Sequence, residues 1–548
     1  KDTHLLFGLQ YAIVETLTND NNNMKITKYL LMGLSVVAFS SCLDTEPLGD
    51  VVTSDQKSTA VEQNPERLSA AVSAITSNFY QYSAIWSEDD NQQNDFGYPA
   101  IMMILDSRGT DMVCHNVGYN WFRQALSYTD NRSTSADTRE IWSTLYNQIY
   151  TCNDVTATVD SATTDATLQY DLGQALAVRA FDYFTLAQLY QKTYSQVDPA
   201  SASGVPIITE KNSNEVATAG CPRGTLKQTY DQILSDLGRA IDALDKSESN
   251  GVARPDKRYV SSAVAHGLGA RVYLVMNKWS EAEKDADYVI QNGGATPKSR
   301  AEASVPSFNS LSENDWLWGI KTSETDRVVT TGISNFPSMM GSLSYGYVSG
   351  TGGVVSKRIN LKLYDKISAT DARKNWFLDG NGVGATLTAE QQEYATSNGL
   401  LPYTQVKYAP YKGSVGTSTN SSDIPLMRVE EMYLIKAEAQ AMAGDPAAGA
   451  ATLTSFVRTY RDPEFTLSAT SAADVQKAVY LQRRIELWGE GFSYLDNLRL
   501  NKGIDRRGGG FDTNDVFNIP AGDPILLFQI PESEYEYNKQ ITSADQNT

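Results

Sequence analysis

Apolar residues recur at steps of three and four along most of the chain after residue 65. This period places them on one face of a helix, and that face must be buried against other elements. The predicted helices cover residues 68–79, 137–159, 172–190 and 226–244. We expect consecutive helices of this kind to pack as antiparallel pairs.

Three long stretches do not follow the helical period, and they are rich in Gly, Ser, Thr, Asn and aromatic residues. They cover residues 91–120, 292–360 and 378–422. Loops of this length in a compact chain are usually functional or mobile. Short strands are expected within them, such as residues 354–357. The spacing of two between Trp316 and Trp318 is also typical of a strand and would place both rings on one face.

The clearest internal repeat lies between residues 264 and 290. Ala270, Tyr273, Trp279 and Ala282 have spacings like those of the tetratricopeptide unit, in which small residues let two helices approach and aromatic rings fill the seam. Residues 428–460 give a looser copy. The sequence therefore predicts a mostly α-helical domain over residues 65–548, with tetratricopeptide-like helical pairs in one curved scaffold, long loops and a few short strands.

The stretch from Leu481 to Leu500 combines an apolar helical face with many charges. Its charged residues are Arg483, Arg484, Glu486, Glu490, Asp496 and Arg499. Opposite charges three or four residues apart can pair along a helix, so we expect a core helix with a solvated, salt-bridged outer face. Gly489 and Gly491 interrupt this helix and predict a bend or a close backbone approach.

Four segments, in this order along the chain, resemble signatures of the SusD/RagB family. They are RAFDYFTLAQLY at residues 179–190, RVEEMYLIKAEA at 428–439, LQRRIELWGEGFSYLDNLRL at 481–500 and IPESEYEYN at 530–538. GYPAIMMILDSRGTDMV at 97–113 also resembles a segment of many SusD-like proteins. In that segment we expect the charges of Asp106, Arg108 and Asp111 to pair beneath the binding loops.

The resemblance implies a tetratricopeptide-like helical scaffold, in agreement with the periodicity. It also implies a non-catalytic surface lipoprotein that captures an oligosaccharide and passes it to a TonB-dependent transporter of the SusC type. Ligand residues in this family vary with the glycan, so the resemblance transfers no site residue to this chain.

The N-terminal region has the pattern of a lipoprotein leader. Residues 1–23 resemble an upstream extension, and residues 24–41 combine a basic start, a short apolar run and small residues, as in a secretory signal peptide. Cys42 follows directly and is the predicted lipidation site, although Phe39 stands where lipoprotein signals usually have Leu. In the alternative, the signal peptide is an ordinary one and the cysteine is incidental. Residues 42–64 are expected to form a polar tether.

These features predict a lipid-anchored protein of a Gram-negative, Bacteroidetes-like outer membrane, facing the cell exterior. Asp44 and Glu46 resemble the acidic export signals of surface lipoproteins in that group. No later stretch approaches the roughly 18 uninterrupted apolar residues that predict a transmembrane helix. The acyl chains, and not a spanning segment, would hold the protein at the membrane.

Charge and composition narrow the choice of partner. The 548 residues carry a formal net charge of −19, which disfavours nucleic acid and anionic membrane surfaces as partners. With 41% hydrophobic and 20% charged residues, the chain has enough apolar side chains for a large core. A neutral ligand fits this balance best.

Candidate catalytic and metal-binding groups are sparse. His115 and His266 are the only histidines after the predicted lipidation site, and His266, among alanines and glycines, is expected in the core. The chain therefore offers few residues for histidine-based catalysis. The acidic cluster at residues 88–95 lacks the Gly and the final Glu that an EF-hand needs. We expect no cofactor and no metal.

Cysteines follow the predicted lipidation site at three positions, which are Cys114, Cys152 and Cys221. A helical domain with a large core does not need disulfides for stability. We therefore expect these three to be reduced and buried, with one disulfide plus a free thiol as the alternative.

Aromatic residues in polar loops are the best candidates for ligand contact. A sugar ring offers an apolar C–H face that an aromatic ring can cover, and hydroxyls that amides, carboxylates and Arg can bind. The predicted contacts are Trp86, Asn91, Tyr98, Trp316, Trp318, Tyr345 and Tyr347. One member of the tryptophan pair is expected to be structural.

Three other functions stay open. A RagB-like member would bind oligopeptides, because that branch shares the same signatures. A surface glycosidase would need two carboxylates, and the chain has many, although no pair stands out. A helical-repeat adaptor would bind no small ligand at all.

Overall fold

The computed structural model describes residues 59–61, 64, 68–82, 94–115, 121–332, 334–348, 356–468 and 470–547. All structural statements below concern these residues, which belong to one compact unit from Ser54 to Thr548. The predicted leader with Cys42, most of the predicted tether, Trp86 and Asn91 lie outside them. No helix in the described ranges is both long and apolar enough to cross a membrane.

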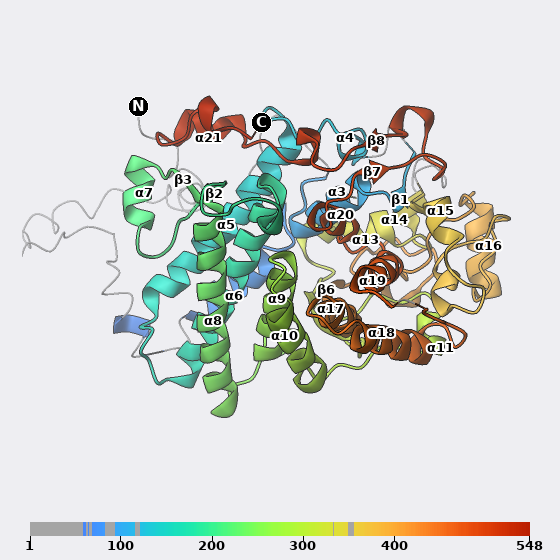
Figure 1. Cartoon of the computed structure of the whole chain (residues 1–548), viewed down its shortest axis with the longest axis horizontal. Coiled ribbons are helices and arrows are strands. Elements are labelled where there is room, and N and C mark those ends of the chain that lie inside the picture. Colours follow the sequence, from blue (N-terminus) through green and yellow to red (C-terminus); the bar gives the residue numbers. More distant parts are fainter. Residues whose placement is uncertain are drawn as a thin grey trace, which may run out of the picture. The chain divides into compact units, whose positions relative to one another are not determined.

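The fold is predominantly helical (Figure 1). The helices of the N-terminal half are α2 (Ser69–Ser77), α3 (Tyr98–Arg108), α4 (Arg123–Leu126), α5 (Ala136–Thr158), α6 (Ala166–Tyr190), α7 (Ser213–Ala219), α8 (Leu226–Ser249), α9 (Ser262–Val275) and α10 (Trp279–Asn292). Those that follow are α11 (Arg300–Ala303), α12 (Arg327–Thr330), α13 (Phe336–Met340), α14 (Tyr345–Val348), α15 (Leu361–Tyr364), α16 (Ala389–Ser397), α17 (Val429–Met442), α18 (Pro446–Tyr460), α19 (Ala472–Glu486), α20 (Ser493–Arg499) and α21 (Glu532–Tyr537). The helices predicted from periodicity are therefore confirmed.

Short antiparallel strand pairs connect distant parts of the chain. They are β1 (Met112–Val113) with β5 (Arg358–Ile359), β2 (Ser203–Pro206) with β3 (Arg223–Thr225), β4 (Trp316–Ile320) with β6 (Ile424–Arg428), and β7 (Ile504–Asp505) with β8 (Asn518–Ile519). The strand predicted at the two tryptophans is β4. Of the strand predicted at residues 354–357, the first half lies outside the described residues and the second half is not a strand, because β5 begins at Arg358.

Helical pairs form the scaffold, as predicted. Helix α6 packs between α5 and α8, and α10 packs between α9 and α17, which in turn contacts α18 and α19 (Figure 1). Glycines make two of these contacts close. A Cβ at Gly269 would collide with a carboxylate oxygen of Asp285, and one at Gly449 would lie 2.5 Å from the carbonyl oxygen of Ala437. The two predicted repeat units are thus the α9–α10 and α17–α18 pairs.

The first predicted loop contains a helix instead. Residues 98–108 form α3, whose side chains are buried on nearly every side. A helix that is buried all round has no exposed polar face, so the amphipathic period that reveals other helices is absent. The prediction of a loop over residues 91–120 is wrong at this segment for that reason.

The predicted bend near residue 490 is confirmed, but the predicted solvated face is wrong. Helix α19 ends at Glu486, and Gly489 and Gly491 have φ values of +80° and +82°. A side chain at position 491 would also meet the backbone of Met102 at 3.1 Å. Of the six charged residues named in this stretch, five are buried: Arg483, Glu486, Glu490, Asp496 and Arg499.

These charges pair inside the protein with residues from distant segments. Both carboxylate oxygens of Glu486 accept hydrogen bonds: Arg428 Nη1 lies 3.1 Å from Oε1, Arg461 Nε lies 2.7 Å from Oε2, and Arg373 Nη1 lies 3.2 Å from Oε2. Burial alone would raise the pKa of Glu486, but Arg461, Arg428 and Arg373 hold it well below its ordinary value. We call these four residues the Glu486 cluster.

The charges of the segment at residues 97–113 also find separate partners. Arg108 pairs with Asp130, Asp111 with Arg484, and Asp106 accepts a hydrogen bond from Gly491 N at 2.9 Å. The expectation that Asp106, Arg108 and Asp111 pair with one another is therefore wrong. Each of them ties this segment to a different part of the chain.

Asp137, in the first turn of α5, is a buried carboxyl with incomplete hydrogen bonding. Its Oδ1 accepts from Asn94 Nδ2 at 2.8 Å, while Oδ2 has no partner among the described residues. Burial, and after it the nearby Asp130, raise the pKa of Asp137 to about 7. The folded protein therefore favours the protonated form of this carboxyl.

We expect Asp137→Asn to flatten the pH dependence of stability between about pH 4 and pH 7. Because the folded pKa lies above the unfolded one, the protonated carboxyl contributes stability below about pH 4 that is lost as pH rises through about 7. Each pH unit in this window changes the free energy of unfolding by up to about 1.4 kcal/mol. Urea unfolding at several pH values measures the slope. Asp365→Asn, at an exposed position, is the control, and an unchanged slope in Asp137→Asn would contradict the assignment.

Candidate ligand-binding site

The two tryptophans predicted as ligand contacts are core residues. Trp316 and Trp318 are 0% and 1% exposed, because both faces of β4 are covered. The Trp318 indole donates a hydrogen bond to Arg258 O at 3.0 Å, and its ring lies 5.3 Å from those of Phe79 and Phe181. The spacing of two predicted that both rings lie on one face of a strand, but it could not show that this face is buried.

The two tyrosines of α14 have different environments. Tyr347 is buried, and its hydroxyl accepts a hydrogen bond from Lys357 N at 2.5 Å. Tyr345 is 53% exposed, although its backbone N–H donates to Thr417 O at 2.9 Å. Of this pair, only Tyr345 can offer its ring to a ligand in solution.

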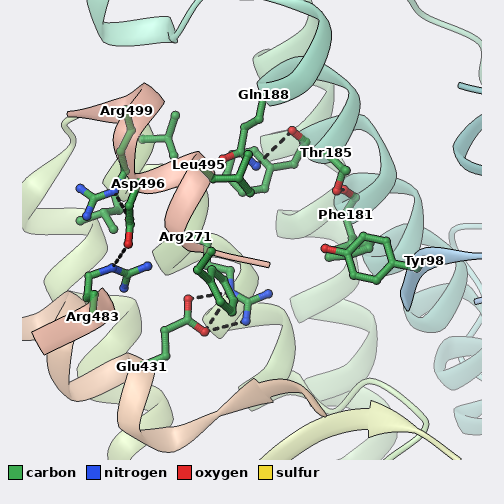
Figure 2. A pocket seen from close by; sticks show the side chains of 14 residues that line it. Tyr98, Phe181, Thr185, Gln188, Arg271, Glu431, Arg483, Leu495, Asp496 and Arg499 are labelled. Carbon is green, nitrogen blue, oxygen red and sulfur yellow. Dashed lines mark hydrogen bonds and ion pairs between the residues drawn. The ribbon is translucent and has the colours of Figure 1, made fainter. Parts of the chain in front are cut away.

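Tyr98 lines a small cavity and not an open surface (Figure 2). The cavity measures about 50 Å³, far below the roughly 300 Å³ at which ligand pockets begin. In Figure 2 Tyr98 lies beside Phe181, with a centroid distance of 4.8 Å, while ion pairs line much of the rest.

The charged groups of this cavity bind one another. Arg271 Nη2 lies 2.6 Å from Glu431 Oε2, and Arg483 Nε lies 2.8 Å from Asp496 Oδ2 (Figure 2). These charged groups already have partners within the protein. The cavity volume of about 50 Å³ leaves room for water but not for a sugar ring. The prediction that Tyr98 contacts the ligand therefore has no support in its position.

The exposed Tyr345 belongs to a polar surface that we call the Tyr345 face. It consists of Tyr345 on α14 and Tyr394 on α16, with the buried Asn420 behind α14. Asn420 Nδ2 donates to Gly332 O at 3.0 Å, and a Cβ at position 346 would lie 3.2 Å from Asn420 Oδ1. The face thus joins residues from three regions that are far apart in sequence.

The pair of phenols on this face suits a ligand with hydroxyl groups. Burial, and after it the proximity of Tyr345, raise the pKa of Tyr394, so a second phenol lies near the exposed ring. Asn420 is 2% exposed, so its side-chain amide lies inside the protein behind α14 and does not meet a ligand. An exposed ring beside a second phenol can cover a sugar face and bind its hydroxyls.

Sequence reasoning missed Tyr394 and the buried Asn420 as members of the Tyr345 face. Both lie in the predicted 378–422 loop region, but Tyr394 is on α16, and its local sequence gives no sign of the face. The signal available was the abundance of polar residues around Asn420, which does not distinguish a site from an ordinary loop.

The described residues contain no group of three or more His, Cys, Asp or Glu side chains arranged to hold a metal ion. Cys114, Cys152 and Cys221 are reduced and buried, as expected. His266, expected in the core, is only partly buried, and its Nδ1 lies 2.8 Å from Asp285 Oδ1.

The tetratricopeptide-like pairs place the chain among proteins built on helical repeats. Comparison with protein families is more specific. A model described as "Starch-binding associating with outer membrane" matches residues 97–274, and the model of the SusD family matches residues 360–548. The chain belongs to the SusD/RagB family.

Individual relatives agree with this assignment. A SusD-like protein of Formosa agariphila is 22% identical over 364 residues, which cover 62% of this chain and 67% of the relative. A SusD-like carbohydrate-binding protein of Bacteroides vulgatus superposes with a TM-score of 0.69 at 22% identity, covering 88% of this chain and 97% of that one. A SusD superfamily protein of Bacteroides thetaiotaomicron gives 0.68 at 20% identity, with 88% and 99% covered. At these identities the solved structures show a shared fold.

Proposed function

We propose that this protein binds an oligosaccharide at the cell surface and delivers it to a SusC-like TonB-dependent transporter without altering it chemically. The observation that carries the proposal is the exposed ring of Tyr345, which lies beside a second phenol on a polar face. The family model described as starch-binding and the relative described as carbohydrate-binding support the same ligand class.

The expected affinity is modest. A few stacked rings at roughly 1 kcal/mol each, plus several polar contacts, would give about 4 to 6 kcal/mol. That free energy corresponds to a Kd nearer the millimolar than the nanomolar range. Weak binding suits a protein that must release its ligand to a transporter.

The predicted lipid anchor supports delivery. Acyl chains on Cys42 would confine the protein to the outer membrane, where a transporter of the SusC type would also lie. Confinement raises the effective concentration of the two partners, so their contact need not be tight. A broad surface of helical pairs is suited to such a contact.

We expect Tyr345→Ala to weaken oligosaccharide binding about 5- to 10-fold, because one stacked ring contributes roughly 1 kcal/mol. Tyr345→Phe keeps the ring and should retain most of the affinity. Isothermal titration against a panel of neutral oligosaccharides measures both. Val516→Ala removes an exposed apolar side chain elsewhere and serves as the control. Equal affinities for Tyr345→Ala and the native protein would rule out this face as the site.

The alternatives give different results in direct assays. If this protein bound oligopeptides, calorimetry would detect binding to a peptide mixture, and the loss of Tyr345 would not weaken that binding. A glycosidase would release new reducing ends during long incubation with glycan, which chromatography detects. A helical-repeat adaptor would show no change in melting temperature with any glycan.

A further inference from the structure

A second and larger hollow lies between α5, α7 and the C-terminal helix α21. We call it the C-terminal hollow, and it is lined by Trp142, Tyr146, Asn147, Tyr150, Glu534 and Tyr537, among others. Its volume of about 540 Å³ falls within the roughly 300 to 1,000 Å³ typical of small-molecule sites. In Figure 1, α7 and α21 lie well away from α14, so this hollow is separate from the Tyr345 face.

Exposed aromatic rings are concentrated at this hollow. Tyr150 is 44% exposed and Tyr537 is 81% exposed, and among the described residues the other large aromatic side chain with comparable exposure is Tyr345. Beneath them Trp142 and Tyr146 are buried, with ring centroids 4.8 Å apart. Exposed rings grouped over a packed aromatic floor are typical of a surface that binds a ligand.

The sequence of α5 explains how rings and polar groups alternate there. The lining positions on α5 are Arg139, Trp142, Ser143, Tyr146, Asn147 and Tyr150. Their spacing of three and four places them on one face of the helix. Asn147 is exposed one turn before Tyr150, so its amide can reach a ligand that lies on that ring. This face combines stacking surface with donors and acceptors.

Polar groups also face the hollow from the C-terminal segment. Asn538 Nδ2 lies 3.3 Å from Glu534 Oε2, which orients the carboxyl group of Glu534. The lining residues include two carboxyl groups, those of Glu534 and Glu536, and a single guanidinium group, that of Arg139. The hollow therefore disfavours an anionic ligand. A neutral ligand with many hydroxyls matches this set.

Hydrogen bonds fix the walls of the hollow before any ligand arrives. Cys221 N donates to Asn538 Oδ1 at 3.0 Å, and Asn538 Nδ2 donates back to Cys221 O at 2.9 Å. Gly220, with φ +77°, permits this contact, since a Cβ there would collide with Asn538 Oδ1. Lys539 Nζ adds a bond to Thr218 O at 3.0 Å. A preformed site loses less conformational entropy on binding.

We infer that the C-terminal hollow is a second saccharide site, which binds a short neutral oligosaccharide between the rings of Tyr150 and Tyr537. This inference rests on the proposed function, because it takes the ligand class from it. Two separate sites on one chain would let a long glycan bind at both and so bind more tightly than at either.

The test compares two sets of variants against one probe. An array of neutral oligosaccharides, including maltoheptaose, identifies the tightest-binding member for the native protein, and titration calorimetry then uses that glycan. Tyr150→Ala/Tyr537→Ala should remove one of two binding sites, or lower affinity roughly 10- to 30-fold, since two rings are lost. Tyr150→Phe/Tyr537→Phe keeps both rings and should bind nearly as the native protein does. Both pairs change exposed side chains, and melting temperatures verify that they fold.

A local readout is available at Cys221, which lines the hollow. Cys221 is 7% exposed, so iodoacetamide should alkylate it slowly in the free protein, and saturating glycan should slow this further; Cys114 and Cys152, both 0% exposed, should stay unmodified in the folded protein. If the double alanine variant binds like the native protein and Cys221 is not protected, the second site is refuted while glycan binding at Tyr345 stands.

Two further outcomes would overturn the inference in different ways. If no array member binds the native protein, the proposed function fails and the inference fails with it. Protection of Cys221 by a peptide but by no glycan would assign the hollow to a protein partner and overturn the saccharide assignment.

Discussion

Replacing Glu486 by alanine is expected to lower the free energy of unfolding by about 3 to 5 kcal/mol, because it leaves buried charge without a partner. The carboxylate accepts hydrogen bonds from Arg428, Arg461 and Arg373, whose side chains are all 0% exposed. Three guanidinium groups would then share the remaining acceptors in a site that water does not reach.

The comparison with Glu486→Gln separates charge from shape. Glutamine keeps the side-chain volume but removes the negative charge, so it should destabilise the protein nearly as much as alanine. Asp231→Asn, at the exposed pair of Lys227 and Asp231, should leave the stability unchanged within error. Urea unfolding followed by circular dichroism measures all three. A loss below about 1 kcal/mol in both Glu486 variants would show that the Glu486 cluster contributes little to the stability of the fold.

The same carboxylate predicts a loss of stability in acid. Its folded pKa lies well below the ordinary value of 4.5, so it contributes stability above pH 4.5 that is lost as pH falls through the folded pKa. The native protein should therefore lose stability below pH 4.5 more steeply than Glu486→Gln does. Urea unfolding in a series of acidic buffers compares the two slopes, and parallel slopes would contradict the lowered pKa.

Replacing Cys42 by serine is expected to release the protein from the membrane almost completely. Each acyl CH₂ buried in the bilayer contributes about 0.8 kcal/mol, so several chains anchor durably and their loss removes the anchor. The described helices offer no spanning segment to replace it. Fractionation of cells into envelope and soluble material, with metabolic labelling by a palmitate analogue, measures the change.

Cys221→Ser is the matched control, since it removes a thiol within the folded unit and should leave both labelling and sedimentation intact. Serine at position 42 should abolish the label. If that variant still sediments with the envelope as firmly as the native protein, the lipidation prediction is wrong, and contacts of the folded unit must hold it at the membrane.

Sequence reasoning succeeded where a single segment carries its own signal. Helices α5 and α8 have one polar and one apolar face, so their periodicity was visible. Helix α6 is also buried on nearly every side, but polar residues recur along it, among them Arg179 and Asp182, and leave the helical period visible. The shorter α3 has an unbroken apolar run from Pro99 to Leu105, which lacks this signal, so it was missed.

The candidate site was less predictable than the scaffold. Trp316 and Tyr345 show why. No local sequence pattern distinguishes an aromatic ring that other segments cover from one that is exposed to solvent. Trp316, Trp318 and Tyr347 are buried by other segments, whereas Tyr345 is left exposed. The members of the Tyr345 face come from separate regions, and only folding brings them together.

Residue spacing within continuous segments was enough to predict the helical-pair scaffold, and the family was indicated by the resemblance of four continuous segments to its signatures. It could not show which charges and rings meet water. Arg428 and Glu486 lie 58 positions apart and pair in the core, and a charge pattern along one helix looks the same whether its partners are solvent or buried arginines. Burial depends on contacts between distant segments, and these form only when the whole chain folds.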